Sequence, residues 1–519
     1  MANKQEFIDA IQKSYSSNEP HIYLGAAILD GEVISDAKVN LPLRMMNRHG
    51  LIAGATGSGK TRTLQVIAEQ LSEAGVPVFL SDIKGDLNGI GKAGTSNPKL
   101  EDRAKALGIQ FNPTEFPVEL YSLTGKVGAQ MRATVSEFGP VLLSKIFELN
   151  DTQQGVLNIL FKYCDDNGLP LIDLNDLKKV LNYLSEGAGA AEIKESYGKI
   201  SSSTSGTILR KIVALEQQGV AQIFGEKSFD VDDLFQKVDG KGVISVLNIS
   251  DMQTNQVVFS TFMVSLLAEL YHTMPEAGDL DKPKLVFFLD EAHLLFNDAP
   301  KAFLDQIEQV IRLIRSKGIG VFFCTQQPTD VPDTVLAQLG NRFQHVLRAF
   351  TPNDADNLAK VVKTYPKSEF YDINKTLTSL GIGQALITVL NEKGIPTEVA
   401  ATHLTPPRSL MGPMPENEYQ NHLNESDVYK KYKVSVDPES AFEMLEERLK
   451  KKTEEQPEEP SKNNTDTEDK PKGRQEKSMI EKVINAPIVR SIGTQLIRST
   501  FSMLFGGRSS STRKKNGFF

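Results

Sequence analysis

The stretch HGLIAGATGSGKTRTLQVIAEQL, residues 49–71, decides the fold of this chain. Gly54 and Gly59 are separated by four residues and are followed by Lys60 and Thr61, which is the phosphate-loop pattern. An apolar run precedes the loop, and apolar residues at helical spacing follow it. This strand, loop and helix order is the context that the pattern requires. The stretch therefore predicts a nucleoside triphosphate site, whereas an accidental glycine-rich turn before a helix is the alternative.

Each part of the loop has an expected physical role. Small residues let backbone N–H groups surround phosphate oxygens, and the helix that follows adds the positive end of its dipole. Lys60 is expected to reach the β- and γ-phosphates, and the Thr61 hydroxyl is expected to coordinate Mg²⁺. The residues expected to bind the nucleotide are Gly54, Ala55, Thr56, Gly57, Ser58, Gly59, Lys60, Thr61 and Arg62.

Two carboxylates end a second apolar run, in KLVFFLDEAH at residues 284–293. We expect Asp290 to lie near the metal and to hold it, usually through water. Glu291 is suited to orienting or deprotonating the attacking water. Alone, this pattern is equally typical of a cap or a turn. Together with the phosphate loop, it indicates hydrolysis and predicts ATP and Mg²⁺ as ligands.

A third apolar run, residues 320–325, ends in Gln326. A glutamine here is suited to sensing the γ-phosphate or positioning water, and satisfying a turn is the alternative role. An arginine delivered across a subunit boundary can raise hydrolysis by roughly 10³ to 10⁵. Each arginine near this run is a candidate for that role, with a surface position as the alternative. These arginines are Arg312, Arg315, Arg342 and Arg348.

Composition sets broader bounds. A length of 519 residues allows two to four domains, and 40% hydrophobic content is ample for a core. The net charge of -8 argues against a wholly basic surface but leaves room for a local basic channel. The two cysteines, Cys164 and Cys324, have no metal-ligand spacing and fit free thiols. We see no secretory apolar core or membrane-length apolar run, so the cytoplasm is the expected location.

Alternating apolar strands and helical patterns predict an α/β fold, with a mainly parallel sheet flanked by helices and interrupted by a helical insertion. The expected division places the ATPase core in two parts. It consists of a short N-terminal extension (1–48), the first core part (49–124), the helical insertion (125–236), the second core part (237–410), a peripheral helical segment (411–449), a disordered charged linker (450–478), and an amphipathic helix with a basic tail (479–519).

Four motifs together resemble the HerA/FtsK superfamily of RecA-like ring ATPases. They are the phosphate loop, DIKGDL at 82–87, VFFLDEAH at 286–293 and RSKGIGVFFCTQQP at 315–328, in the order that the superfamily has. The chain looks most like bacterial HerA-like P-loop ATPases, over most of residues 20–410 and the tail. The resemblance implies a RecA-like P-loop NTPase fold, a homo-oligomer in the form of a hexameric ring, and double-stranded DNA as the moved object. It also makes Arg315 the candidate arginine finger.

Two alternatives stay open from the sequence. A motor or switch could act on an unidentified protein partner, as in secretion-type relatives, with the helical insertion as the contact surface. The tail helix at 486–505 combines an apolar stripe with Arg490 and Arg498. It is predicted to dock on a neighbouring subunit, with an anionic membrane surface or nucleic acid as the other candidates.

Overall fold

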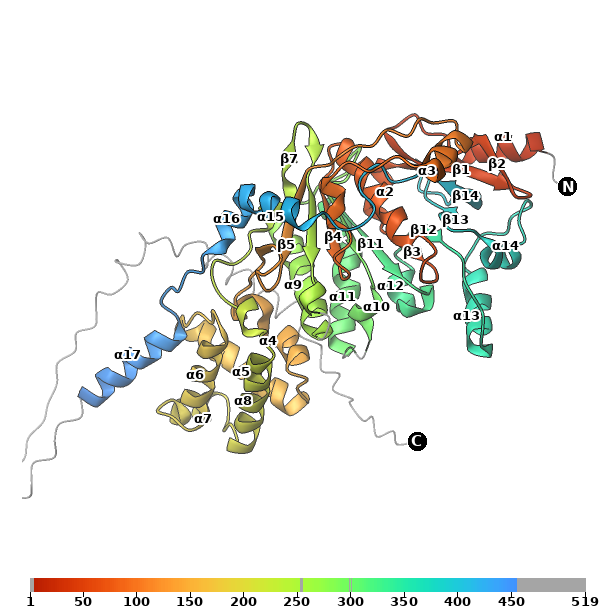
Figure 1. Cartoon of the computed structure of the whole chain (residues 1–519). Helices are drawn as coiled ribbons and strands as arrows, with labels where there is room; N and C mark the ends of the chain where they lie inside the picture. The colour runs from red at the N-terminus through yellow and green to blue at the C-terminus, as the bar shows by residue number, and fades with distance from the viewer. Residues whose placement is uncertain (1–3, 253–254, 298, 300, 455–519) are drawn as a thin grey trace, which may run out of the picture.

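A 12-stranded sheet forms the centre of the computed structural model, which describes residues 4–252, 255–297, 299 and 301–454 (Figure 1). The strand order is β2-β1-β14-β13-β12-β3-β11-β10-β4-β9-β5-β6. The strands are β1 (His21–Leu29), β2 (Glu32–Pro42), β3 (Gly50–Ala53), β4 (Val78–Asp82), β5 (Val118–Ser122), β6 (Ala129–Gln130), β9 (Ile244–Asn248), β10 (Leu285–Leu289), β11 (Ile319–Thr325), β12 (Asn341–Gln344), β13 (Gln384–Thr388) and β14 (Ala400–Leu404).

The strands from β12 to β6 in this order pair in parallel. Every residue of β10 and of β11 is buried, as expected for parallel strands covered on both faces. Their apolar runs were therefore readable in the sequence as strands. The predicted α/β class, with a mainly parallel sheet flanked by helices, is confirmed.

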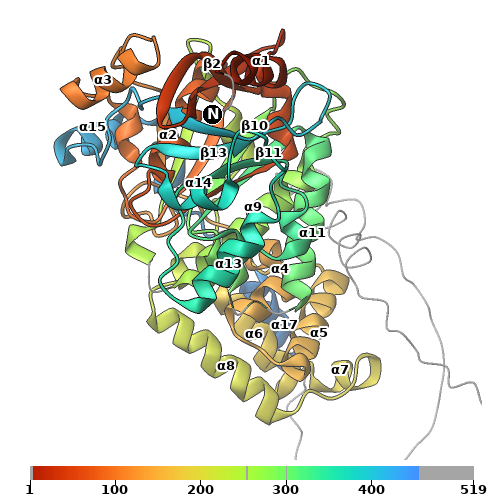
Figure 2. The same cartoon turned by 90° about the vertical axis from the view of Figure 1, so that its right-hand side faces the viewer.

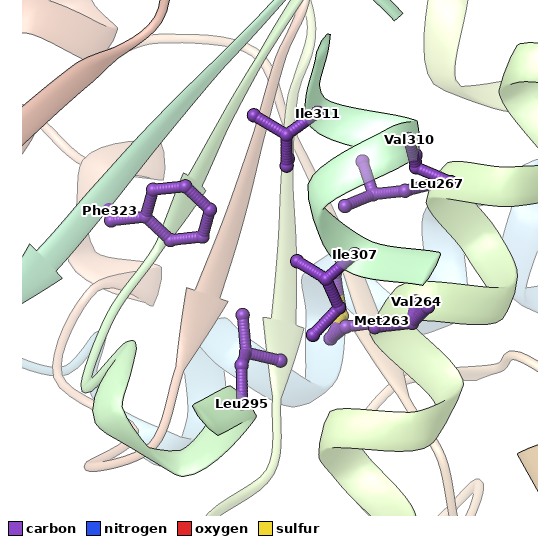
Figure 3. Close-up of a pocket in the computed structure, with 8 residues that line it drawn as sticks. All are labelled: Met263, Val264, Leu267, Leu295, Ile307, Val310, Ile311 and Phe323. Carbon is purple, nitrogen blue, oxygen red and sulfur yellow. The ribbon is translucent and has the colours of Figure 1, made fainter. Parts of the chain in front are cut away.

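Neighbouring phenylalanines of β10 and β11 face opposite sides of the sheet, as side chains of a strand must. On one face, Phe287 and Phe323 pack in the cluster that includes α9 (Gln256–Thr273) and α11 (Lys301–Ile314). Figure 3 shows Phe323 facing apolar side chains of both helices around a small apolar pocket. On the other face, Phe288 and Phe322 pack in the cluster that includes α2 (Lys60–Glu73).

The strands β13, β14, β1 and β2 extend the sheet by antiparallel pairing. Residues 1–48, predicted as a short extension, thus supply two strands of the main sheet, together with α1 (Lys4–Tyr15). The buried Tyr15 hydroxyl donates to the carbonyl oxygens of Ile387 and Glu398, at 3.0 and 2.7 Å. The beginning of the described chain is therefore joined to the strands that end the core.

The insertion is a group of helices at the lower end of the molecule in Figures 1 and 2. Side-chain caps define their starts: Thr134 and Glu137 form a capping box on the first helix, and Asn150 and Gln153 form another on the second. The helices are α4 (Val135–Ile146), α5 (Asp151–Asn167), α6 (Leu174–Ser185), α7 (Ala190–Ser196) and α8 (Ser202–Gln217).

The segment after the core returns to this insertion. It forms α15 (Glu416–Glu425), α16 (Asp427–Lys433) and α17 (Ala441–Glu454), and α17 packs against α6. The Asp176 carboxylate of α6 accepts a hydrogen bond of 2.9 Å from the Phe442 backbone N–H. Apart from the end of α17, the predicted linker at 450–478 and tail at 479–519 lie outside the described residues. In the part of the chain that is described, no helix is long and apolar enough to cross a membrane.

A buried lysine connects the insertion to the core. The Lys145 ammonium of α4 donates to the Ser260 hydroxyl of α9 at 3.0 Å and lies 3.4 Å from the centre of the Phe303 ring of α11. Burial lowers the pKa of Lys145 to about 7, because the charged form is poorly solvated there.

We expect Lys145→Met to stabilise the protein at pH 7. Between pH 7 and 10.5 the unfolded chain, with the ordinary lysine pKa of 10.5, binds more protons than the folded chain. Wild-type stability therefore rises with pH in this window, by at most about 1.4 kcal/mol per pH unit, and the full cost is present below pH 7. The methionine variant lacks this dependence, so its urea-unfolding midpoint should exceed that of the wild type at pH 7, and the difference should shrink steadily as the pH rises toward 10.5. Exposed Lys194→Met is the control, and an equal pH dependence in all three proteins would contradict the assignment.

Candidate nucleotide site

The phosphate loop joins β3 to α2 and contains three glycines with positive φ. Gly54, Gly57 and Gly59 have φ of 152°, 77° and 110°, a region that other residues rarely adopt. A Cβ atom on Gly54 would also lie 2.4 Å from the Cβ atom of His345. The loop can therefore curl only because these positions lack side chains.

The polar groups of the loop fit a phosphate ligand. The Lys60 ammonium donates to the carbonyl oxygens of Gly54 and Ala55, at 2.6 and 3.3 Å, so it lies over the loop. The Ser58 hydroxyl is buried and has no hydrogen-bond partner among the described residues. Burial lowers the pKa of Lys60, against the opposing effects of Glu291 and Asp290. An anion in the loop would favour the charged ammonium and supply acceptors for these donors.

Asp290 and Glu291 directly follow β10, at the same edge of the sheet as the loop. The Asp290 backbone N–H donates to the Ser81 hydroxyl at 2.8 Å, and the Glu291 N–H donates to the Asp290 carboxylate at 3.0 Å. Glu291 has a φ of 48°, which is unusual for a residue other than glycine. Burial and then the Glu291 charge raise the pKa of Asp290 to about 7. Asp290 and Thr61 supply the oxygen donors that Mg²⁺ prefers, and a cation there would stabilise the ionised carboxylate.

Two side chains that the sequence analysis did not select lie near the Glu291 carboxylate. Lys84 approaches one carboxylate oxygen at 3.8 Å, and His293 Nδ1 approaches the other at 3.5 Å. Lys84 is carried by the turn after β4, which the Asp82 carboxylate holds by accepting from three backbone N–H groups. The DIKGDL motif could have identified Lys84, because the motif places a lysine in the turn that directly follows a strand.

Gln326 follows β11, which lies between β3 and β10 in the sheet. Gln326 therefore lies at the edge of the sheet that carries the loop and Asp290. It is exposed there. The turn contacts belong instead to Gln327, whose amide oxygen accepts from Asn357 at 3.0 Å and whose N–H donates to Asp330 at 2.9 Å. The turn contacts that were the alternative role for Gln326 are therefore made by Gln327.

The structure does not bring Arg315 to the site of its own chain. Arg315 is exposed and begins the short helix Arg315–Lys317, which precedes β11, whereas the site lies at the opposite, carboxyl end of that strand. Arg312 is exposed in α11, and Arg342 donates to the carbonyl oxygens of Leu339 and Leu336 near the start of β12. Of the four arginines, only Arg348 follows its strand at the site edge.

His345 lies beneath the loop and was not selected from the sequence. Its Nε2 atom is 2.9 Å from the Thr63 hydroxyl of α2, and the residue is fully buried against Gly54. Burial lowers the pKa of His345 to about 4, so the ring is neutral at pH 7. A single histidine at a strand end carries no pattern that could have identified it.

Comparison with known proteins places this site in a family. The family model described as helicase HerA-like C-terminal matches residues 28–514. The chain belongs to this family. It is a P-loop ATPase, as the resemblance in its motifs predicted.

The HerA-like relatives are distant in sequence. The DNA double-strand break repair helicases HerA of Sulfurisphaera tokodaii and Sulfolobus acidocaldarius are 23% and 22% identical, over 70% and 68% of this chain. The matches span 67% and 64% of those relatives, so about a third of their length has no counterpart in the alignment. The DNA import protein CedB of S. acidocaldarius is 22% identical over 73% of this chain and 56% of its own. A solved structure of the bacterial conjugative coupling protein TrwBdeltaN70 shares the fold, with a TM-score of 0.50, 13% identity, and coverage of 78% of this chain and 93% of the chain in that structure.

We expect Gly54→Ala to weaken nucleotide binding by more than tenfold. The new methyl group combines an unfavourable φ with the clash against His345, so the loop must shift. Gly31→Ala is the matched control, since Gly31 also has positive φ but has no atom near its Cβ position and lies in the β1–β2 turn. The control should lose only about 1 kcal/mol of stability, with unchanged affinity for a fluorescent ATP analogue. Equal affinity in both variants would contradict the proposed close packing of the loop.

Proposed function

We propose that this HerA-family protein binds ATP with Mg²⁺ at the loop 54–62 and hydrolyses it within a hexameric ring that moves double-stranded DNA. The observation that carries the proposal is the convergence of Lys60, Gln326, Asp290 and Glu291 at one edge of the parallel sheet. A phosphate-binding loop opposite a pair of carboxylates is the arrangement that phosphoryl transfer to water requires.

The roles follow from position and chemistry. Lys60 and the backbone of the loop would hold the phosphates, while Thr61 and Asp290 would hold the cation. When bound, Mg²⁺ would supply charge neutralisation on the phosphate oxygens. Glu291 is partly buried and follows β10, next to the strand that Gln326 follows. Glu291 would therefore accept the proton of an attacking water that Gln326 would orient.

The proposed ring is compatible with Arg315 as the arginine finger only if the arginine acts on a neighbouring subunit. An arginine at the amino end of the strands cannot serve the site of its own chain at their carboxyl end. In a ring of identical subunits, a head-to-tail contact joins two different surfaces, so one subunit's Arg315 would complete the next subunit's site.

DNA is favoured over protein as the moved object because the HerA relatives are named for DNA double-strand break repair and CedB is named for DNA import. The net charge of -8 requires that any DNA contact be a local basic surface. A protein partner that contacts the helical insertion is the alternative.

Duplex DNA should stimulate ATP hydrolysis at low salt, and the stimulation should fall steeply as salt rises, because DNA contacts release counterions. The measurement is the steady-state ATPase rate with and without duplex DNA across a salt series.

The Glu291→Gln variant should bind ATP normally yet lose about 10²- to 10⁴-fold in hydrolysis rate, since glutamine keeps the shape of the side chain but cannot act as a base. No stimulation at any salt, with one protein co-purifying with Glu291→Gln, would favour the protein-acting alternative.

Mixing two inactive variants tests the contribution across the subunit boundary. Lys60→Ala removes the phosphate contact, and Arg315→Ala removes the proposed finger. If the arginine acts on the next subunit, an equal mixture re-forms complete sites at roughly a quarter of the interfaces and recovers that share of activity. The control replaces Arg315→Ala with Lys317→Ala, because Lys317 is a neighbouring cation. A mixture no more active than its components would exclude Arg315 as the finger.

A further inference from the structure

A tight turn at residues 381–383 packs directly against the phosphate loop. The Gly383 N–H donates to the Ser58 carbonyl oxygen at 3.1 Å. A Cβ atom on Gly59 would lie 3.1 Å from the same Gly383 nitrogen, so only glycine allows this approach without displacement. The turn links α14 (Ile373–Ser379) to β13, which Figure 2 shows next to each other.

Arg103 also holds this turn. It belongs to α3 (Pro98–Ala106), and its guanidinium donates to the carbonyl oxygens of Ile382, Gly383 and Leu404, each at 3.0 Å. The side chain of Gln384 adds a further contact by accepting from the Gly381 N–H at 2.8 Å. Charge-assisted bonds to successive carbonyl groups fix the backbone of the turn in one position.

The tip of the turn is an exposed apolar side chain. Ile382 is 76% exposed although its backbone is held on both sides. Scattered exposed apolar residues are ordinary. This one differs because it is held beside the backbone of a phosphate-binding loop.

The sheet order indicates which part of the nucleotide lies near this turn. Gln326 and Asp290 follow β11 and β10, on one side of β3, so the γ-phosphate is expected on that side. The turn precedes β13, which pairs with β12 on the other side of β3. Because β13 is antiparallel to β12, its start lies at the same edge as the loop. A triphosphate that runs along the loop would therefore direct its nucleoside toward residues 381–383.

We propose that the turn 381–383 is the wall of the nucleoside end of the site, with Ile382 in contact with the base of ATP and Arg103 as the residue that positions the turn. This inference rests on the proposed ATP site. The apolar side chain of Ile382 suits the face of a purine. Arg103 occupies the carbonyl groups of residues 382 and 383, so the turn presents mainly this side chain to the ligand.

The test compares binding of a non-hydrolysable ATP analogue with binding of inorganic tripolyphosphate, both with Mg²⁺, by calorimetry on the full chain. Ile382→Ala should weaken the ATP analogue about three- to tenfold, which is less than a methylene group contributes in a closed pocket because this wall is open, and leave tripolyphosphate within about twofold. Arg103→Ala should have the same selective effect, because the turn loses its support. Ile382→Leu should retain the wild-type affinity.

Ile395→Ala is the matched control, since Ile395 is 56% exposed in the turn at the other end of β13. It should change neither affinity. Unchanged binding of the ATP analogue to Ile382→Ala, or equal weakening of both ligands, would overturn the assignment of the turn. A wild type that binds neither ligand would overturn the phosphate site itself and this inference with it. The two failures are distinct because only the second abolishes binding of tripolyphosphate to the wild type.

Discussion

Parallel pairing of β3, β11 and β10 is the constraint on which the rest of the structure depends. Ala53 is paired with Thr325, and Phe323 with Leu289, so the three strands end at one edge of the sheet. The residues that follow them are the first loop glycine, Gln326 and Asp290. Because all side chains of β10 and β11 are buried, a one-residue shift of register would move each side chain to the opposite, differently packed face of the sheet, and this cost holds the three chemical groups in alignment.

The burial that holds the strands also sets the electrostatics of the site. Asp290 has a pKa raised to about 7, and His345, beneath the loop, has a pKa lowered to about 4. Both shifts have the same origin, since a poorly hydrated environment disfavours the charged form of each group. The loop therefore rests on a neutral ring that adds no charge to the phosphate site. Asp290, by contrast, has an ionisation that a bound cation can control.

The helix after the loop is tied to the end of the core as well as to the sheet. The buried Glu69 carboxylate of α2 accepts from the backbone N–H groups of Arg408 and Ser409, at 2.9 and 3.0 Å. Gln65 donates to the Ser409 hydroxyl at 2.7 Å and accepts from Arg62 at 2.7 Å. The segment that leads to α15 is therefore anchored directly to the helix that follows the phosphate loop.

The sequence by itself determined the local chemistry. Phosphate binding needs contiguous small residues, a lysine and a hydroxyl, and Asp290 and Glu291 end an apolar run, so each signal lies within about ten residues. The parallel strands were also readable, because burial on both faces requires continuous apolar runs. Only the tertiary structure decided that β1 joins β14, that His345 supports the loop, and that Arg103 holds the turn beside it. These contacts join segments hundreds of residues apart, and no single segment carries a pattern that names its partner.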